Sequence, residues 1–199
     1  ASHAFVDLAE LQKKVGERIA DLTQNEAAYI TSGAAAGIML SAAACVAIKH
    51  PDTKPIFPQL SKDCEVIIYR SHRNGYDYGI NQVGFKVIEI DATADGLKNA
   101  ICEKTASIFW FQGAMTRDDD LPLEKMIQIA QEHQIPVIVD AAAQLPPVEN
   151  LWKFTQMGAA LAIFSGGKDL CRLILKHFEK VLVRISAKVV FFFQAQLHS

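Results

Sequence analysis

The sequence has few cysteines, and none of them is placed for metal binding or for a disulfide framework. There are 4 among 199 residues, with no CxxC pair and no histidine at ligand spacing. This pattern argues against a zinc site and favours the reduced thiols of an intracellular protein. We therefore expect a cytoplasmic protein that binds no metal. The cysteines are Cys45, Cys64, Cys102 and Cys171.

The sequence also lacks an excess of charge of one sign and a long hydrophobic run. Its 20 basic and 22 acidic residues give a formal net charge of −2, which argues against nucleic acid or an anionic membrane as the partner. Residues 27–48 carry no charge, but they are mostly Ala, Gly, Ser and Thr and favour a packed helix over a membrane span. No signal peptide is visible, because residues 1–14 have the pattern of an amphipathic helix.

What the sequence does contain is a regular alternation of predicted helices and strands. Apolar residues at three-and-four spacing predict a helix over residues 5–22. Short runs rich in Val and Ile, such as "CEVIIYR", "ASIFWF" and "PVIVDAAAQ", predict buried strands between helices. Strands without period-two polarity are typical of a parallel sheet that is covered on both faces. The predicted fold class is therefore α/β, with three layers, a mostly parallel sheet and helices on both faces.

Polar residues directly follow the predicted strands. Ligands of such sheets bind beyond the carboxyl ends of the strands, so these residues are the candidates for a functional site. They come from separate segments that the topology would bring to one edge of the sheet. The candidates are Thr31, Ser32, Gly33, Ser71, His72, Arg73, Asn74, Gln112, Asp140, Gln144, Ser165 and Lys168.

Three of these segments together suit pyridoxal 5'-phosphate. The segment "TSGAAAG" predicts free backbone N–H groups and a hydroxyl at a helix N-terminus, which suits a phosphate. Asp140 ends an apolar strand, where a carboxylate needs a cationic or hydrogen-bonded partner such as a protonated ring nitrogen. Lys168, if held in a partly desolvated cationic pocket, would supply an amine that forms a Schiff base with an aldehyde. Pyridoxal 5'-phosphate has a phosphate, a ring nitrogen that can be protonated and an aldehyde, which match the three segments in turn.

Each of these segments also has a purely structural interpretation. The Ser-Gly turn could simply cap a packed helix, Asp140 could cap the next turn, and Lys168 alone is best explained as an exposed lysine. His72 is either a flat ring stacked on the cofactor or a histidine of a surface turn. It is the combination that favours the cofactor.

Further polar residues are weaker candidates for the same site. Ser165 could donate an additional hydrogen bond to the phosphate. Gln112 and Gln144 could approach the ring hydroxyl, although each is more simply a hydrogen bond at a strand end. Residues 118–120 are three consecutive aspartates and predict a solvated loop that precedes a helix.

With these residues identified, the chain resembles the pyridoxal-phosphate enzymes of the aspartate-aminotransferase fold, and more narrowly the selenocysteine-synthase-like group. The resemblance rests on "AAYITSGAAAGIMLSAAA", "HRNGYDYGINQVGFKVIEI" and "PVIVDAAAQLPPVENLWKFTQMGAALAIFSGGK", in that order. It spans roughly residues 5–171. The combination of "VDAAAQLPP" with "FSGGK" is its specific signal.

The resemblance implies a role for each matching residue. Lys168 would form the Schiff base with the cofactor and act as the catalytic base, and Asp140 would hold the ring nitrogen. His72 would face the ring. The phosphate cradle would consist of Ser32, Gly33 and Ala34, with Ser165 assisting.

The implied activity is that of an ammonia-lyase that acts on a 2-amino sugar acid phosphate such as D-glucosaminate 6-phosphate. Elimination of the β-hydroxyl and loss of ammonia would give a 2-keto-3-deoxy acid phosphate. The group also performs selenium transfer to a seryl-tRNA, and transamination is a further alternative on the same cofactor. A small-molecule substrate and a homo-oligomer, a dimer or larger, are the implied partners.

The tail of the sequence departs from the family pattern. After residue 171 a Gly-Pro-Gln type turn and a complete C-terminal domain are expected, but "RLILKHFEKVLVRISAKVVFFFQAQLHS" follows instead. We therefore predict a pyridoxal-phosphate-binding domain over residues 1–171, without its N-terminal lead-in, and a non-family tail over 172–199 that a frameshift would explain. The alternative function is a fragment that only binds phosphate or associates.

Overall fold

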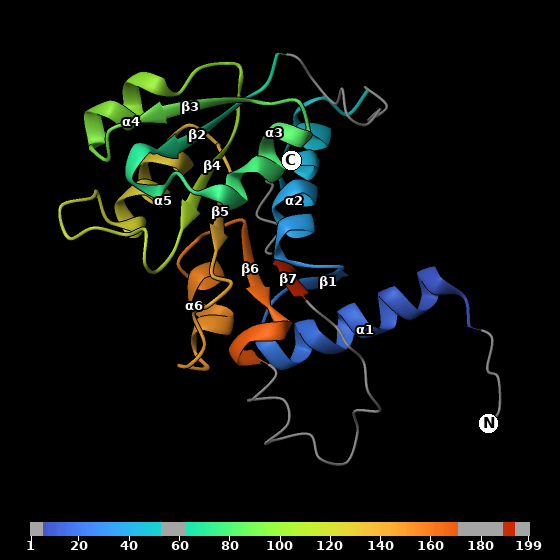
Figure 1. The fold of residues 1–199 in the computed structure, drawn as a ribbon. Helices are drawn as coiled ribbons and strands as arrows, with labels where there is room; N and C mark the ends of the chain where they lie inside the picture. The colour runs from blue at the N-terminus through green and yellow to red at the C-terminus, as the bar shows by residue number, and fades with distance from the viewer. Residues whose placement is uncertain (1–5, 53–62, 171–188, 194–199) are drawn as a thin grey trace.

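The computed structural model describes residues 6–52, 63–170 and 189–193. The strands are β1 (Ala27–Thr31), β2 (Glu65–Tyr69), β3 (Lys86–Ile90), β4 (Thr105–Phe111), β5 (Val137–Asp140), β6 (Leu161–Ser165) and β7 (Val189–Phe193). They form one seven-stranded sheet in the order β1-β7-β6-β5-β4-β2-β3 (Figure 1). The strands from β6 to β3 pair in parallel, which confirms the predicted fold class.

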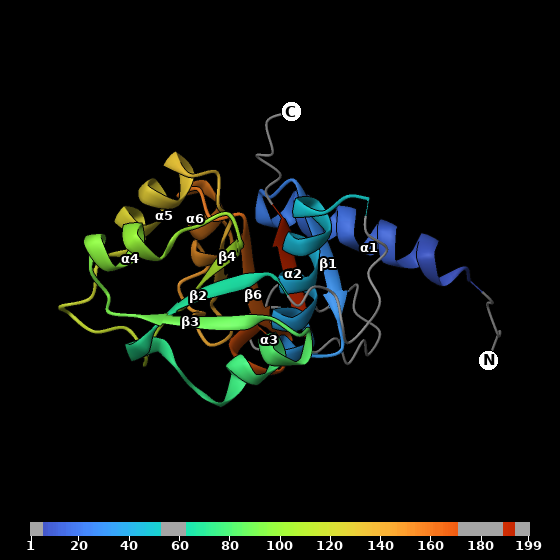
Figure 2. The same ribbon diagram turned by 90° about the horizontal axis from the view of Figure 1, so that it is seen from above.

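Helices cover both faces of this sheet. The helices are α1 (Leu8–Thr23), α2 (Ala34–Lys49), α3 (Tyr78–Gln82), α4 (Ala94–Ala100), α5 (Leu123–Glu132) and α6 (Asn150–Gln156). Helices α2 and α3 lie on one face, here called the α2 face, and α4, α5 and α6 lie on the other, here called the α5 face (Figure 2). Helix α1 packs along β1.

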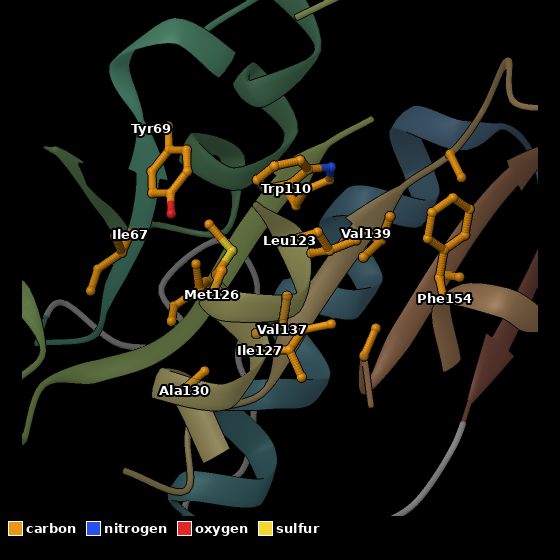
Figure 3. Packing of buried hydrophobic residues seen from close by; sticks show 14 of the residues in the cluster. Ile67, Tyr69, Trp110, Leu123, Met126, Ile127, Ala130, Val137, Val139 and Phe154 are labelled. Atoms are coloured by element: carbon orange, nitrogen blue, oxygen red, sulfur yellow. The ribbon is translucent and has the colours of Figure 1, made fainter. Parts of the chain in front are cut away.

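Side chains of the central strands alternate between the two faces, as the pleat of a strand requires. Phe109 and Ile138 belong to the apolar cluster beneath α2, whereas Trp110 and Val139 belong to the cluster beneath α5 and α6. Figure 3 shows the second cluster, with Trp110 and Val139 beside residues of the covering helices. Because both faces are buried, the strands need no polar alternation, which is why their sequences read as continuous apolar runs.

Helix α1 shows how local sequence fixes an element and its packing. The Asp7 side chain accepts a hydrogen bond from the Glu10 backbone N–H at 2.9 Å and so caps the first turn. On the packed side, Gly16 faces the backbone of β1, and a Cβ at this position would collide with the carbonyl oxygen of Ala28. The glycine therefore permits the close approach of α1 to the edge strand.

Strand β7 comes from the segment that we predicted to be a non-family tail. Val189–Phe193 lies inside the sheet, between β1 and β6, and runs antiparallel to both. Residues 189–193 therefore belong to the same sheet as the strands of residues 1–171. The rest of that segment, residues 172–188 and 194–199, lies outside the described residues.

Two further sequence expectations concern membranes and metals. Among the described residues, no helix combines the length and the apolar composition that a bilayer span needs. The same part of the chain brings no three His, Cys, Asp or Glu side chains together at a distance suited to a metal ion.

Candidate active site

The carboxyl edge of the sheet carries a buried carboxylate, Asp140, as the last residue of β5. Its side chain is on the α2 face because it is two residues after Ile138. The residue is 8% exposed, and its Oδ1 accepts a hydrogen bond from the Ala142 N–H at 3.0 Å. Burial raises the pKa of Asp140 to about 6, while the Ala142 N–H and the positive charge of Lys168 act in the opposite direction. A carboxylate in this setting is suited to a cationic ligand.

Lys168 lies in the turn that follows the neighbouring strand β6. The turn is Gly166–Leu170, and the backbone of Lys168 within it is not helical, with φ −98° and ψ −128°. The side chain is exposed, and its Nζ lies 5.9 Å from the centroid of the Tyr76 ring. The partly desolvated surroundings that we predicted for Lys168 are therefore not found in the described part of the chain, because no side chain there covers the amine.

The Ser-Gly turn leads from β1 into α2 at the same edge. Ser32 is exposed, and Gly33 is the residue before the first helical turn, where no side chain caps the helix. The Thr31 hydroxyl instead donates to the Gly33 carbonyl at 3.0 Å. A Cβ added at Gly33 would meet no atom within 4 Å, so the space in front of this turn is open. The first N–H groups of α2, beginning at Ala34, are thus free to bind an anion.

Strand β7 lies between β1 and β6 and therefore sets the distance between the Ser-Gly turn and Ser165. Thr31 at the end of β1 and Ser165 at the end of β6 are both in register with Val189, one on each side of β7. On the other side of β6, the Ser165 N–H donates to the Ala142 carbonyl at 3.3 Å. The Ser-Gly turn, Ser165, Lys168 and Asp140 therefore meet on the α2 face, as the strand order required.

His72 does not join this group. Its ring is fully buried on the α5 face, 4.5 Å from the Trp110 ring by centroid distance and inclined to it by 81°. The Nδ1 atom accepts a hydrogen bond from the Phe111 N–H at 3.3 Å, and Nε2 lies 3.3 Å from Asp120 Oδ2. Burial lowers the pKa of His72, and the Asp120 carboxylate opposes that shift. The predicted stacking role does not fit this position, because neither face of the ring is open to a ligand.

Asp120 is the residue that the sequence interpretation missed. We predicted a solvated loop, but the Asp120 side chain is only 6% exposed. It accepts hydrogen bonds from the Ser71 hydroxyl at 3.1 Å and from the Arg117 N–H at 2.9 Å, in addition to its contact with His72. A row of three aspartates gives no signal that distinguishes the one that is buried. The carboxylate fastens the loop after β4 to the end of β2.

The side chains of Gln112 and Gln144 lie on the α5 face, away from the Asp140 carboxylate, although the Gln112 backbone N–H donates to the Asp140 carbonyl at 2.9 Å. Gln144 Nε2 donates to the Gln112 carbonyl at 3.4 Å, and Gln112 Oε1 accepts from the Trp110 indole N–H at 2.6 Å. Gly113, with φ +107°, leaves the room that Gln144 occupies, because a Cβ there would collide with Gln144 Nε2. Both glutamines line a cavity of about 430 Å³ on the α5 face.

The chain is similar to known proteins in both sequence and fold. No family model matches the chain. It is 35% identical over 182 residues to D-glucosaminate-6-phosphate ammonia lyase of Salmonella typhimurium, a match that covers 84% of this chain and 47% of the relative. A solved structure of D-glucosaminate-6-phosphate ammonia-lyase superposes with a TM-score of 0.81 at 28% identity, over 97% of this chain and 50% of that one.

A second solved structure has a lower identity and shows the fold alone. It is an O-acetylhomoserine (thiol)-lyase of Campylobacter jejuni that carries a pyridoxyl-lysine phosphate, with a TM-score of 0.61, 16% identity, and coverage of 93% of this chain and 40% of that one. The fold is that of the fold type I pyridoxal-phosphate enzymes. The resemblance predicted from the sequence is therefore confirmed. The chain spans about half the length of the proteins that it matches.

Proposed function

We propose that this chain binds pyridoxal 5'-phosphate on the α2 face and belongs to an ammonia-lyase that acts on a 2-amino sugar acid phosphate such as D-glucosaminate 6-phosphate. The observation that carries the proposal is the buried Asp140 carboxylate at the end of β5, beside Lys168 and the open N-terminus of α2. A buried carboxylate without a strong partner is unfavourable, and a protonated ring nitrogen would offset its cost. The similarity to the Salmonella lyase supports the choice of substrate class.

The residues at this edge fit the cofactor group by group. The first N–H groups of α2, with Ser32, Gly33 and Ala34, would hold the phosphate, and Ser165 on the neighbouring strand would add a hydroxyl. Asp140 would hold a proton on the ring nitrogen, and the Lys168 amine would bind the aldehyde carbon. When bound, the cofactor supplies an electron sink for the carbon that loses its proton.

The chain's own contribution to the reaction is proton movement at Lys168 Nζ and charge balance at Asp140. Once the substrate has displaced it, the Lys168 amine would take the proton from the carbon that carries the amino group. The bond to the neighbouring hydroxyl would then break, and the hydroxyl would leave as water with the proton held on Lys168 Nζ. A water molecule is consumed when ammonia is released, so the substrate is converted to a 2-keto-3-deoxy acid phosphate and ammonia without net change in water.

The exposure of Lys168 favours a second candidate, a chain that binds the phosphate group without performing the reaction alone. General bases of this kind work in water-excluded surroundings, which the described residues do not provide around this amine. We propose that association, either with a second copy of the chain or with the remaining part of a longer one, supplies the missing cover. Sedimentation velocity with and without the cofactor tests this association.

The test of the proposed site is borohydride reduction of the purified chain with excess pyridoxal phosphate, followed by peptide mass spectrometry. We expect a single reduced adduct at Lys168 and a yellow solution before reduction. Lys168→Ala would abolish both, whereas Lys98→Ala, which removes an exposed lysine of α4, would leave them unchanged. An adduct spread over several surface lysines would contradict the site.

The test of the proposed reaction is release of ammonia and of a 2-keto acid from D-glucosaminate 6-phosphate, compared with L-serine and L-alanine. Turnover of the amino sugar acid phosphate alone supports the lyase, and a keto acid formed from alanine supports transamination. A correctly loaded chain that turns over none of the three supports the second candidate.

A further inference from the structure

The cavity on the α5 face is separate from the residues proposed to hold the cofactor. Its volume is about 430 Å³, and neither Asp140, Ser165 nor Lys168 lines it. Its wall comes from the end of β4, the loop after β5, the loop before α5, the start of α5 and α6. Cavities of this size in α/β proteins hold small ligands, and this one lies at the carboxyl edge, where such ligands bind.

The inner wall of this cavity is apolar and buried. Trp110, Leu123 and Phe154 line it, and each is at most 5% exposed. Figure 3 shows the three side chains on the same face of the sheet, from β4, α5 and α6 respectively. The Trp110 indole N–H donates to Gln112 Oε1 at 2.6 Å, which orients the ring in this wall.

The lining of the cavity includes two exposed cationic side chains. Arg117 and Lys153 both line it and both are exposed. Within the described ranges neither side chain forms an ion pair, in contrast to Arg70, whose guanidinium lies 2.7 Å from Asp91, and to Arg73, which contacts Asp77. A guanidinium and an ammonium at one cavity mouth are suited to a phosphate or a carboxylate.

The loop that carries Arg117 is held in place. The Arg117 N–H donates to the buried Asp120 carboxylate at 2.9 Å, and that carboxylate also accepts the Ser71 hydroxyl. The backbone of Arg117 is therefore fixed while its side chain stays uncommitted, which is the arrangement of a preorganised binding group. Asp118 and Glu124 add exposed carboxylates at the same mouth, where they are placed to accept hydrogen bonds from hydroxyl groups.

We propose that this cavity is a second ligand site, which binds a phosphorylated polyol acid through Arg117 and Lys153. The cations would hold the anionic end, and the carboxylates and the amides of Gln112 and Asn150 would hold the hydroxyl groups. The site lies across the sheet from the proposed cofactor residues, so it stands or fails independently of them.

The test is calorimetric titration of the full chain with 6-phosphogluconate, which has the phosphate and hydroxyl groups but no amine to react with the cofactor. Gluconate, which lacks the phosphate, and inorganic phosphate, which lacks the hydroxyl groups, are titrated separately. Their affinities show how much each kind of group contributes to binding. We expect 6-phosphogluconate to bind more tightly than either. Arg117→Gln and Lys153→Gln should each weaken it roughly tenfold or more, because each removes a charged hydrogen bond. Lys125→Gln, on α5 but outside the cavity, is the matched control.

A second measurement needs no change to the cavity. In a Trp152→Phe chain the only remaining tryptophan is Trp110, so binding of 6-phosphogluconate should change its fluorescence with the affinity found by calorimetry. No heat and no fluorescence change at millimolar ligand would overturn the proposal, as would equal binding by the parent chain and both cavity variants. The borohydride adduct at Lys168 should form equally in these variants. Its absence there and in the parent chain would count against the cofactor site and leave the cavity proposal standing.

Discussion

Asp120 and Asp140 have buried side chains near the carboxyl edge, on opposite faces of the sheet, and their carboxylates are satisfied very differently. Asp120, on the loop that borders the α5 face, accepts hydrogen bonds from a hydroxyl and a backbone N–H and contacts His72. For Asp140, on the α2 face, the one hydrogen bond given for its carboxylate among the described residues comes from the Ala142 N–H. The Asp120 carboxylate stabilises the loop that carries it, whereas the Asp140 carboxylate can accept further hydrogen bonds.

This difference indicates a structural role for Asp120 and a ligand-binding role for Asp140. Buried polar groups of folded proteins are normally satisfied, so one that is poorly satisfied marks a site where something else binds. The same contrast extends to the surroundings. His72 packs against the rings of Tyr69 and Trp110, whereas Lys168 is exposed among the described residues and a Cβ at Gly33 would meet none of their atoms within 4 Å. We expect substitutions on the two faces to have opposite effects on stability.

Asp140→Asn should stabilise the cofactor-free chain at pH 7. Burial raises the pKa of Asp140 from 3.8 to about 6, which corresponds to a cost of about 3 kcal/mol when the carboxylate is ionised in the folded state. The neutral amide avoids this cost. Urea unfolding of the two chains at pH 7 measures the difference, and a less stable variant would show that the carboxylate is already satisfied.

The pH dependence provides the control for this prediction. Because the folded chain holds the Asp140 proton more tightly than the unfolded one, its stability should fall as the pH rises through the window from about 4 to 6. The advantage of Asp140→Asn should therefore shrink below pH 6 and vanish near pH 4. An advantage that is constant with pH would have another origin.

Asp120→Asn should have the opposite sign. It replaces an acceptor with a group that presents an N–H toward the donors of Ser71, Arg117 and His72, and we expect a loss of about 2 kcal/mol in the free energy of unfolding. The same urea titration measures it. An unchanged stability would mean that the loop after β4 does not depend on this carboxylate.

A pair of glycines extends the comparison to the backbone. Gly113→Ala should cost about 1–3 kcal/mol, because its φ of +107° is unfavourable for alanine and the new Cβ would collide with Gln144. Gly167→Ala, where the Cβ meets no atom within 4 Å, should change stability by less than about 0.5 kcal/mol. Thermal unfolding compares the two, and equal costs would remove the contrast between the faces.

The smallest expected effect is the titration of His72. Its pKa is lowered in the folded state by burial, so the unfolded chain takes up the proton first and stability should fall as the pH drops below about 6.5. In the Asp140→Asn background this slope is free of the opposing Asp140 contribution. His72→Gln in that background should flatten the unfolding free energy between pH 7 and 6, and an unchanged slope would assign it to another group.

Much of the fold was predictable because it follows from local pattern. Continuous apolar runs such as Val137–Val139 require burial on both faces, and the polar residue that ends such a run must lie at the carboxyl edge. Asp140, Lys168 and the Ser-Gly turn could be placed together on this ground alone. Which face each side chain occupies was not predictable in the same way, since His72 and Gln144 follow strands like the others but point to the α5 face.

The burial of Asp120 was hidden for a different reason. Asp118, Asp119 and Asp120 are chemically identical, and only Asp120 meets Ser71, which precedes it by 49 residues. The position of β7 was hidden in a similar way, because its partners β1 and β6 lie far from it in sequence. Such contacts depend on how segments that are distant in sequence pack together, so the spacing of neighbouring residues does not predict them.

The sequence by itself determined the α/β class, the polar residues at the strand ends and the kind of chemistry that they share, since each of these depends on neighbouring residues and on the pleat of a strand. Only the tertiary structure decided that β7 sets the distance between the Ser-Gly turn and Lys168, that Asp140 is poorly satisfied while Asp120 is satisfied, and that a second cavity lies across the sheet. The physical reason is that burial and hydrogen bonding of a polar group depend on partners brought from elsewhere in the chain.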